Sequence, residues 1–149
     1  MNPIEQATIK DAEEILSLQK LAYVSEAEIY NDYTIHPLTQ TLEESKQSFE
    51  SSLVLKYVED GNIIGSVRAF EKEGICYIGK LMVHPDHQNK GIGRRLMQEI
   101  ESRFPGAVYE LFTGSKSVKN ISLYEKLGYK GFKQEKLPVE DTVFLYMRK

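Results

Sequence analysis

The stretch from residue 75 to residue 104 constrains the fold more than any other part of the chain. It begins with an apolar run, Ile75 to Val83, which predicts a buried strand, and it ends with an amphipathic segment, 91–104, which predicts a helix. A short polar loop joins the two, and Gly91 and Gly93 stand where the helix begins. A strand that turns directly into a helix in this way is typical of mixed α/β domains.

The start of this helix is a candidate binding site for an anion. The first backbone N–H groups of a helix have no partner within it, and this end carries about half a positive charge. Glycine has no Cβ, so Gly91 and Gly93 allow a phosphate to approach the backbone closely. Lys90, Arg94 and Arg95 add positive charge beside them. The alternative is structural, because glycines also mark any tight strand-to-helix turn.

Two common phosphate-binding motifs do not fit this stretch. A dinucleotide-binding turn requires a third glycine at position 96, where the chain has Leu96, and it belongs to an early parallel strand–helix–strand unit. A Walker loop requires Gly-Lys-Ser or Gly-Lys-Thr, which the sequence lacks. The sequence therefore argues against a domain that binds NAD or ATP.

The segment Gln88-Asn89-Lys90-Gly91-Ile92-Gly93 resembles the acetyl-CoA signature of the GNAT superfamily of N-acetyltransferases, Gln/Arg-x-x-Gly-x-Gly/Ala. The strand end before it, Leu81 to Pro85, is similar to the Leu-x-Val-x-Pro of that family. The resemblance implies that backbone N–H groups from Gln88 to Arg94 hold the pyrophosphate of acetyl-CoA. It also implies that the strand edge from Leu81 to Val83 pairs with the pantetheine arm.

A second segment, 120–129, is similar to the other cofactor element of the same family. Asn120 and Tyr124 are four residues apart, so a helix presents them on one face, with Leu123 and Leu127 on a neighbouring face suited to the core. The resemblance implies that Asn120 binds the pantetheine or diphosphate and that the Tyr124 hydroxyl approaches the thioester sulfur. The alternative is that Asn120 caps the helix and Tyr124 packs inward. The cofactor-binding residues expected on this basis are Leu81, Met82, Val83, Gln88, Asn89, Lys90, Gly91, Ile92, Gly93, Arg94, Asn120 and Tyr124.

The rest of the chain predicts one domain, residues 1–149, with no repeat and no linker. Strands are expected at 4–8, 53–59, 63–70, 75–83, 107–113, 129–134 and 142–147, and helices at 9–22, 41–51, 91–104 and 120–127. Capping boxes at Thr8 and Thr41 begin the first two helices, and Asp60-Gly61 marks a hairpin. The order β-α-α-β-β-β-α-β-α-β-β is that of the GNAT acyl-CoA N-acyltransferase fold, a mixed α/β sheet covered by helices.

The amino-acid composition argues against some classes of binding partner and cellular location. A net charge of −3 and a pI near 5.7 argue against nucleic acid, which selects for an excess of positive charge. No apolar run approaches the ~20 residues of a membrane span, and the first residues do not resemble a signal peptide, so a cytoplasmic location is expected. The single Cys76 lies in an apolar run and is expected in the core. With three scattered histidines, it predicts no metal site.

The resemblance implies transfer of an acetyl group from acetyl-CoA to the primary amine of a small molecule or peptide. Tyr124 is the expected catalytic residue, as a donor to the departing sulfur, and a backbone N–H near Met82 or Val83 is expected to stabilise the oxyanion. The base is left open among Glu71, Glu73 and Glu110. The alternative function is a regulatory module that senses acetyl-CoA without turnover, and a homodimer is a family-level expectation.

The acceptor is predicted less directly. In the GNAT family the first two helices and the last hairpin wall the acceptor side, which here means residues 23–33 and the loop at 137–141. The first of these segments contains three acidic residues and three tyrosines. Such a wall favours a polyamine, peptide or aminoglycoside over an acidic amine.

Overall fold

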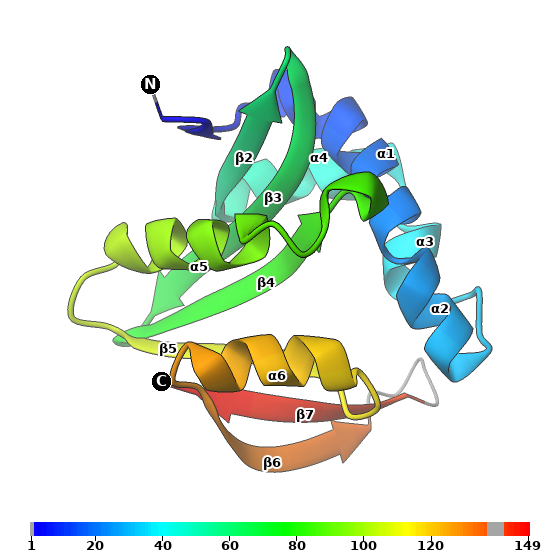
Figure 1. Ribbon diagram of the computed structural model, residues 1–149. Helices are drawn as coiled ribbons and strands as arrows, with labels where there is room; N and C mark the ends of the chain where they lie inside the picture. Colours follow the sequence, from blue (N-terminus) through cyan, green and yellow to red (C-terminus); the bar gives the residue numbers. More distant parts are fainter. Residues whose placement is uncertain (1, 137–141) are drawn as a thin grey trace.

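The computed structural model describes residues 2–136 and 142–149, and these form one seven-stranded mixed sheet with helices on both faces (Figure 1). The strands are β1 (Ile4–Gln6), β2 (Leu53–Glu59), β3 (Asn62–Lys72), β4 (Ile75–Val83), β5 (Val108–Gly114), β6 (Lys130–Lys136) and β7 (Val143–Arg148), in the sheet order β1-β2-β3-β4-β5-β7-β6. The helices are η1 (Ile9–Asp11), α1 (Ala12–Ala22), α2 (Val24–Tyr30), α3 (His36–Thr39), α4 (Leu42–Ser51), η2 (Pro85–His87), α5 (Ile92–Ser102) and α6 (Val118–Lys126).

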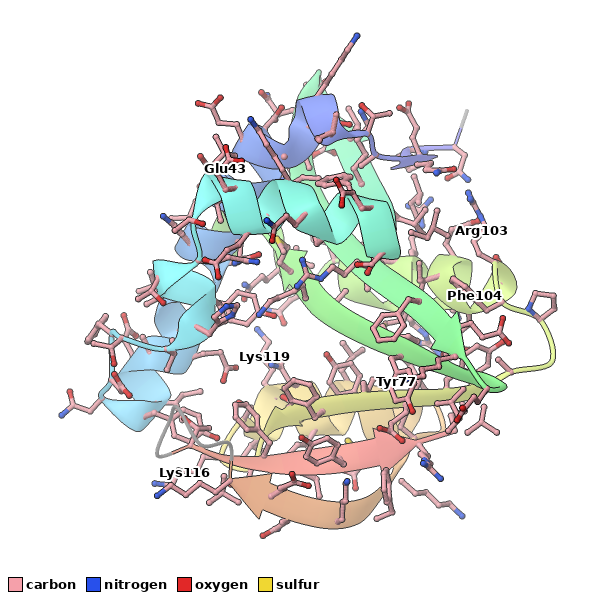
Figure 2. The ribbon with its side chains drawn as sticks, turned by 180° about the vertical axis from the view of Figure 1, so that it is seen from behind. Glu43, Tyr77, Arg103, Phe104, Lys116 and Lys119 are labelled. Carbon is pink, nitrogen blue, oxygen red and sulfur yellow. The ribbon has the colours of Figure 1, made fainter. Side chains whose placement is uncertain are left out.

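The helices form two layers with the sheet between them. In Figure 1, α5 and α6 lie in front of the sheet, whereas the view from behind in Figure 2 brings α4 to the front. Leu96, Met97 and Ile100 of α5 are fully buried in the main core, together with Leu55 and Val67 of the sheet. A second cluster packs α1 against the other face of the sheet. The apolar stripe predicted along α5 is therefore what fixes this helix to the sheet.

The sheet divides where β4 meets β5. These two strands pair in parallel only along Ile75–Tyr77 and Val108–Glu110, and the described residues supply no strand partner for the rest of this β4 edge. Within β4 there is an extra residue, because Ser66 faces Met82 while Arg68 faces Gly79, and Lys80 adopts a left-handed φ of 52° at this bulge. A bulge bends a strand and increases its twist. The second half of β4 therefore diverges from β5 and leaves an open edge.

All the elements expected from the sequence are present in the expected order, so the mixed α/β fold is confirmed. The Thr41 capping box is also confirmed, since Glu44 N–H donates to the Thr41 hydroxyl at 3.2 Å and Thr41 N–H donates to the Glu44 carboxylate at 2.9 Å. The first strand is shorter than expected and ends at Gln6. Two short helices, α2 and α3, were not expected. The loop 137–141 of the predicted acceptor wall lies outside the described residues.

Candidate active site

A cleft of about 680 Å³ lies where β4 and β5 diverge. Both halves of the sheet contribute to it, and so do α2, α3, the end of α4 and α6. Its lining residues are Tyr23, Glu26, Tyr30, Ile35, His36, Pro37, Ser48, Ser51, Ser52, Arg68, Ala69, Phe70, Tyr77, Ile78, Gly79, Lys80, Leu81, Leu111, Phe112, Thr113, Gly114, Asn120, Tyr124, Thr142 and Phe144. Figure 2 shows the side chain of Tyr77 on β4, where this strand leaves β5. The cleft is large enough for a small organic ligand and has mainly apolar and aromatic walls.

Tyr124 lies in the wall that α6 contributes to this cleft. Its side chain is 8% exposed, and its ring packs edge-on against Tyr129 with the centroids 6.0 Å apart. Within the described part of the chain its hydroxyl has no hydrogen-bond partner. Burial raises the pKa of this phenol, and Tyr23 and the Glu26 carboxylate raise it further. Tyr124 therefore stays protonated at neutral pH, which suits a hydrogen-bond donor.

Glu26 of α2 also lines the cleft and contacts α6 directly. Its carboxylate accepts a 3.0 Å hydrogen bond from the side-chain amide of Asn120 and a second, short hydrogen bond from the Ser117 hydroxyl. Among the described lining residues it is the only acidic side chain. The sequence indicates that Glu26 belongs to an acidic segment but gives no sign of its contact with α6, because 91 and 94 residues separate it from its two donors.

Asn120 does not cap α6. The helix begins at Val118, and the N-cap position belongs to Ser117, so Asn120 lies within the first turn. The capping alternative for Asn120 is therefore wrong. Its side-chain oxygen has no hydrogen-bond partner among the residues described, and this leaves an acceptor beside the cleft. The binding role that the resemblance implies for Asn120 stays a prediction.

Tyr23, at the junction of α1 and α2, links this helical wall to the open edge of β4. Its hydroxyl donates a 3.3 Å hydrogen bond to the carbonyl oxygen of Leu81. Burial raises the pKa of the phenol and nearby Glu26 raises it further, whereas Arg68 acts in the opposite direction. Tyr23 is therefore close enough to interact electrostatically with both the Glu26 carboxylate and the Arg68 guanidinium. The Lys80 ammonium also lies 5.8 Å from the centre of its ring.

The expected phosphate-binding loop lies at the N-terminus of α5. Gly91 occupies the N-cap with a left-handed φ of 82°, no side chain caps the helix, and Asn89 is also left-handed, with a φ of 63°. Asn89, Lys90, Gly91 and Arg94 are exposed. Uncapped N–H groups in an exposed loop that contains two left-handed residues fit an anion such as a pyrophosphate.

Neighbouring side chains hold this loop in place. The Gln88 amide nitrogen donates to the Val83 carbonyl at 3.1 Å, and Lys119 of α6 donates to the Gln88 amide oxygen at 3.2 Å. Ile92 and Met82 are buried in the core, so only their backbone is available to a ligand. The Arg95 guanidinium donates to the Tyr57 hydroxyl of β2 at 2.7 Å.

The three carboxylates considered as bases do not line the cleft. Glu71 and Glu73 are exposed at the β3–β4 hairpin, and Glu110 accepts a 2.8 Å hydrogen bond from Arg148. The cleft instead contains a cation that was not among the predicted site residues, Arg68 of β3. An alternating strand pattern assigns Arg68 to one face of the sheet but cannot show that this face borders a cleft.

Two properties concern the described residues as a whole. Across residues 2–136 and 142–149, no three His, Cys, Asp or Glu side chains come together in a way that could hold a metal ion. In the same residues, no helix combines the length and apolar character needed to cross a membrane.

The sequence identifies the family, and the fold agrees with it. The sequence model of the Acetyltransferase (GNAT) family matches residues 12–129, a range that includes the α5 loop, Glu26 and Tyr124. The fold is that of solved acetyltransferases. The chain therefore belongs to the GNAT family of acetyltransferases.

Individual relatives cover the chain to different extents. The Bacillus subtilis protein YqkA, a UPF0157 protein, is 32% identical over 126 residues, which are 84% of this chain and 36% of YqkA. The chain thus spans little more than a third of that relative. Glucosamine 6-phosphate N-acetyltransferase from Schizosaccharomyces pombe is 33% identical over 94 residues, which are 56% of this chain and 84% of that protein.

Solved structures show the fold at low sequence identity. The ribosomal-protein-S18-alanine N-acetyltransferase from Escherichia coli superposes with a TM-score of 0.80 at 17% identity, covering 99% of this chain and 92% of that one. The protein yncA from Salmonella typhimurium, solved with its cofactor acetyl-CoA, has a TM-score of 0.75 at 19% identity, covering 98% and 91%.

Proposed function

We propose that this protein transfers an acetyl group from acetyl-CoA to the primary amine of a small molecule or peptide. One arrangement carries the proposal: Tyr124, a buried and protonated phenol, lines a cleft beside the edge of β4 that has no strand partner among the described residues. Membership of the acetyltransferase family supports it. So do the named activities of relatives, one of which acts on glucosamine 6-phosphate and another on a ribosomal-protein alanine.

Acetyl-CoA supplies a thioester carbonyl that an amine can attack. The backbone N–H groups from Gln88 to Arg94 would hold its pyrophosphate, with Lys90 and Arg94 adding positive charge. The open edge from Leu81 to Val83 would pair with the pantetheine arm as an added strand. Asn120, beside that edge, has a side-chain oxygen available to accept a hydrogen bond from the same arm.

The amine needs a proton acceptor. An amine with a pKa near 10.4 is neutral in only about one molecule in a thousand at pH 7.4. Glu26 is positioned for this role, because Ser117 and Asn120 orient its carboxylate and it is the acidic residue of the described lining. It would bind the ammonium form and accept its proton, either directly or through one water.

Two hydrogen-bond donors would complete the reaction. A backbone N–H near Met82 or Val83 would donate to the carbonyl oxygen as negative charge develops on it. Tyr124 would donate to the sulfur as the carbon–sulfur bond breaks and the new carbon–nitrogen bond forms. An unperturbed tyrosine titrates about 1.5 pKa units above a thiol, and burial widens this gap, so the phenol acts by hydrogen bonding rather than by complete proton transfer.

The direct test is thiol release from acetyl-CoA with purified protein and a panel of primary amines. Amine-dependent release that falls at least about tenfold in Tyr124→Phe supports the transferase. Tight binding of acetyl-CoA with no release across a broad panel would instead favour a sensor of this molecule. We further propose a cytoplasmic location and a homodimer, which sedimentation analysis and cell fractionation would test.

A further inference from the structure

Arg68 is a charged residue in the middle of a sheet, and the proposed chemistry does not use it. Its neighbours on β3, Val67 and Ala69, are 0% and 1% exposed in the core beneath α5. Side chains alternate across a strand, so Arg68 projects from the opposite face, toward α1 and α4. There it lines the cleft, close to Ser48 at the end of α4. The Arg68 guanidinium therefore lies in the cleft wall, at a position where an apolar side chain would extend the hydrophobic core.

The positive charge of Arg68 is not balanced within the described part of the chain. No carboxylate there forms an ion pair with it, and the one acidic lining residue, Glu26, already accepts hydrogen bonds from Ser117 and Asn120. Burial lowers the pKa of the guanidinium, because the charged form loses hydration in the cleft wall. A partly buried cation gains most from a carboxylate or phosphate, to which arginine can donate two parallel hydrogen bonds.

The position of Arg68 indicates that this anion belongs to the acceptor rather than to acetyl-CoA. The pyrophosphate loop, residues 88–94, lies at the N-terminus of α5 and contributes nothing to the cleft lining. Arg68 projects toward the face of the sheet opposite α5. Tyr23 is within electrostatic range of both Glu26 and Arg68, so the two charges belong to one region of the cleft.

We propose that Arg68 selects acceptors that carry, besides the reacting amine, an anionic group such as a carboxylate or a phosphate. The amine lies toward Glu26 and Tyr124, and the anion lies against Arg68. This inference rests on the proposed acetyl transfer. It also reverses the expectation of a cationic acceptor, which relied on an acidic segment at residues 23–33. Of the three acidic residues in that segment, only Glu26 lines the cleft.

The test uses pairs of amines that differ only in the anionic group. Butylamine is compared with 4-aminobutyrate, and ethanolamine with O-phosphoethanolamine, by kcat/KM in the thiol-release assay. We expect the wild-type protein to prefer the anionic member of at least one pair by about tenfold or more. The pair that shows the preference distinguishes a carboxylate site from a phosphate site.

Substitutions of Arg68 test whether this residue causes the preference for the anionic amine. The ratio of the two kcat/KM values should fall close to one in Arg68→Gln and recover in part in Arg68→Lys. Arg103→Gln, at the exposed C-terminus of α5, is the matched control and should retain the wild-type ratio. Calorimetry with CoA-loaded protein gives a second readout, in which the preferred anionic amine should bind the wild type and not Arg68→Gln.

The possible results separate this inference from the proposed function. Wild-type protein that acetylates both members of each pair equally well overturns the role of Arg68 and leaves the transferase intact. A preference for the anionic member that survives Arg68→Gln also overturns it. If the wild-type protein acetylates no amine at all, this result contradicts the proposed function. It then also contradicts the proposed selectivity for anionic acceptors, which rests on that function.

Discussion

The side-chain amide of Asn120 donates a 3.0 Å hydrogen bond to the carboxylate of Glu26, and this contact joins α6 to α2. Both helices line the cleft, and Ser117 makes a second contact to the same carboxylate. The residue that the family resemblance assigns to the cofactor thus also orients the only acidic group in the described lining. In the proposed reaction, Asn120 would therefore couple binding of the acyl donor to handling of the amine proton.

Glu26→Gln should lower kcat/KM for amine acceptors by about tenfold or more at pH 7, because the proton acceptor is lost. The deficit should shrink as the pH rises toward the amine pKa near 10.4, where the amine loses its proton without help. Initial rates between pH 7 and pH 9.5 measure this trend. Glu28→Gln changes an exposed carboxylate on the same helix and should behave as wild type. A Glu26→Gln deficit that is independent of pH would exclude a role as proton acceptor.

Tyr124→Phe should lower kcat by at least about tenfold and leave the dissociation constant of CoA unchanged, because its hydrogen bond is made to the departing sulfur. Since burial raises the pKa of Tyr124, the phenol stays protonated across the working range, and its ionisation should cause no loss of rate up to pH 9.5. Tyr109→Phe is the control, because its hydroxyl bonds the carbonyls of Glu101 and Phe104 away from the cleft. Equal turnover by Tyr124→Phe and wild type would remove the role.

Local sequence patterns predicted the large elements of this fold and missed the small ones. The Thr41 capping box, the Asp60-Gly61 hairpin and the apolar stripe of α5 each satisfy their requirements within a few residues, so they can be recognised in a short window. Helix α2 has seven residues, no side-chain cap and one buried residue, so the sequence carries no signal for it. Helices of this length depend on tertiary contacts, which a local pattern does not contain.

The same limit explains what was predicted of the site. The α5 loop and Tyr124 lie in contiguous motifs, so both could be recognised. The contacts of Glu26 and the exposure of Arg68 to a cleft depend on the divergence of β4 from β5, which the bulge at Lys80 produces. A lysine with a left-handed backbone conformation, such as Lys80, cannot be recognised from the sequence. The acidic segment 23–33 therefore could not show that a cation, Arg68, also lines the cleft beside Glu26.

Gly91→Ala and Gly93→Ala should have opposite effects on stability, although both glycines belong to the same motif. Gly91 has a φ of 82°, so alanine there costs about 1–2 kcal/mol of backbone strain even though a Cβ would meet nothing within 4 Å. At Gly93 a Cβ would lie 3.6 Å from Leu123 and 3.8 Å from Leu81 and Val83, in ordinary contact, and alanine should stabilise the helix by up to about 1 kcal/mol. Urea denaturation of both variants measures the difference, and equal destabilisation would contradict it.

Cys76 should be unreactive in the folded protein, because it is fully buried in the main core and burial raises its pKa to about 12. At pH 8 only about one thiol in ten thousand would then be a thiolate, against roughly a tenth or more in the unfolded chain. A disulfide reagent should therefore modify the protein only after guanidinium is added.

The raised pKa of Cys76 also makes the free energy of unfolding depend on pH, since the protonated thiol is favoured in the folded state. This contribution is complete below pH 9 and is lost as the pH rises from 9 to about 12. The free energy of unfolding should fall more steeply over that interval in wild type than in Cys76→Val, and parallel curves for the two proteins would count against a buried, protonated thiol.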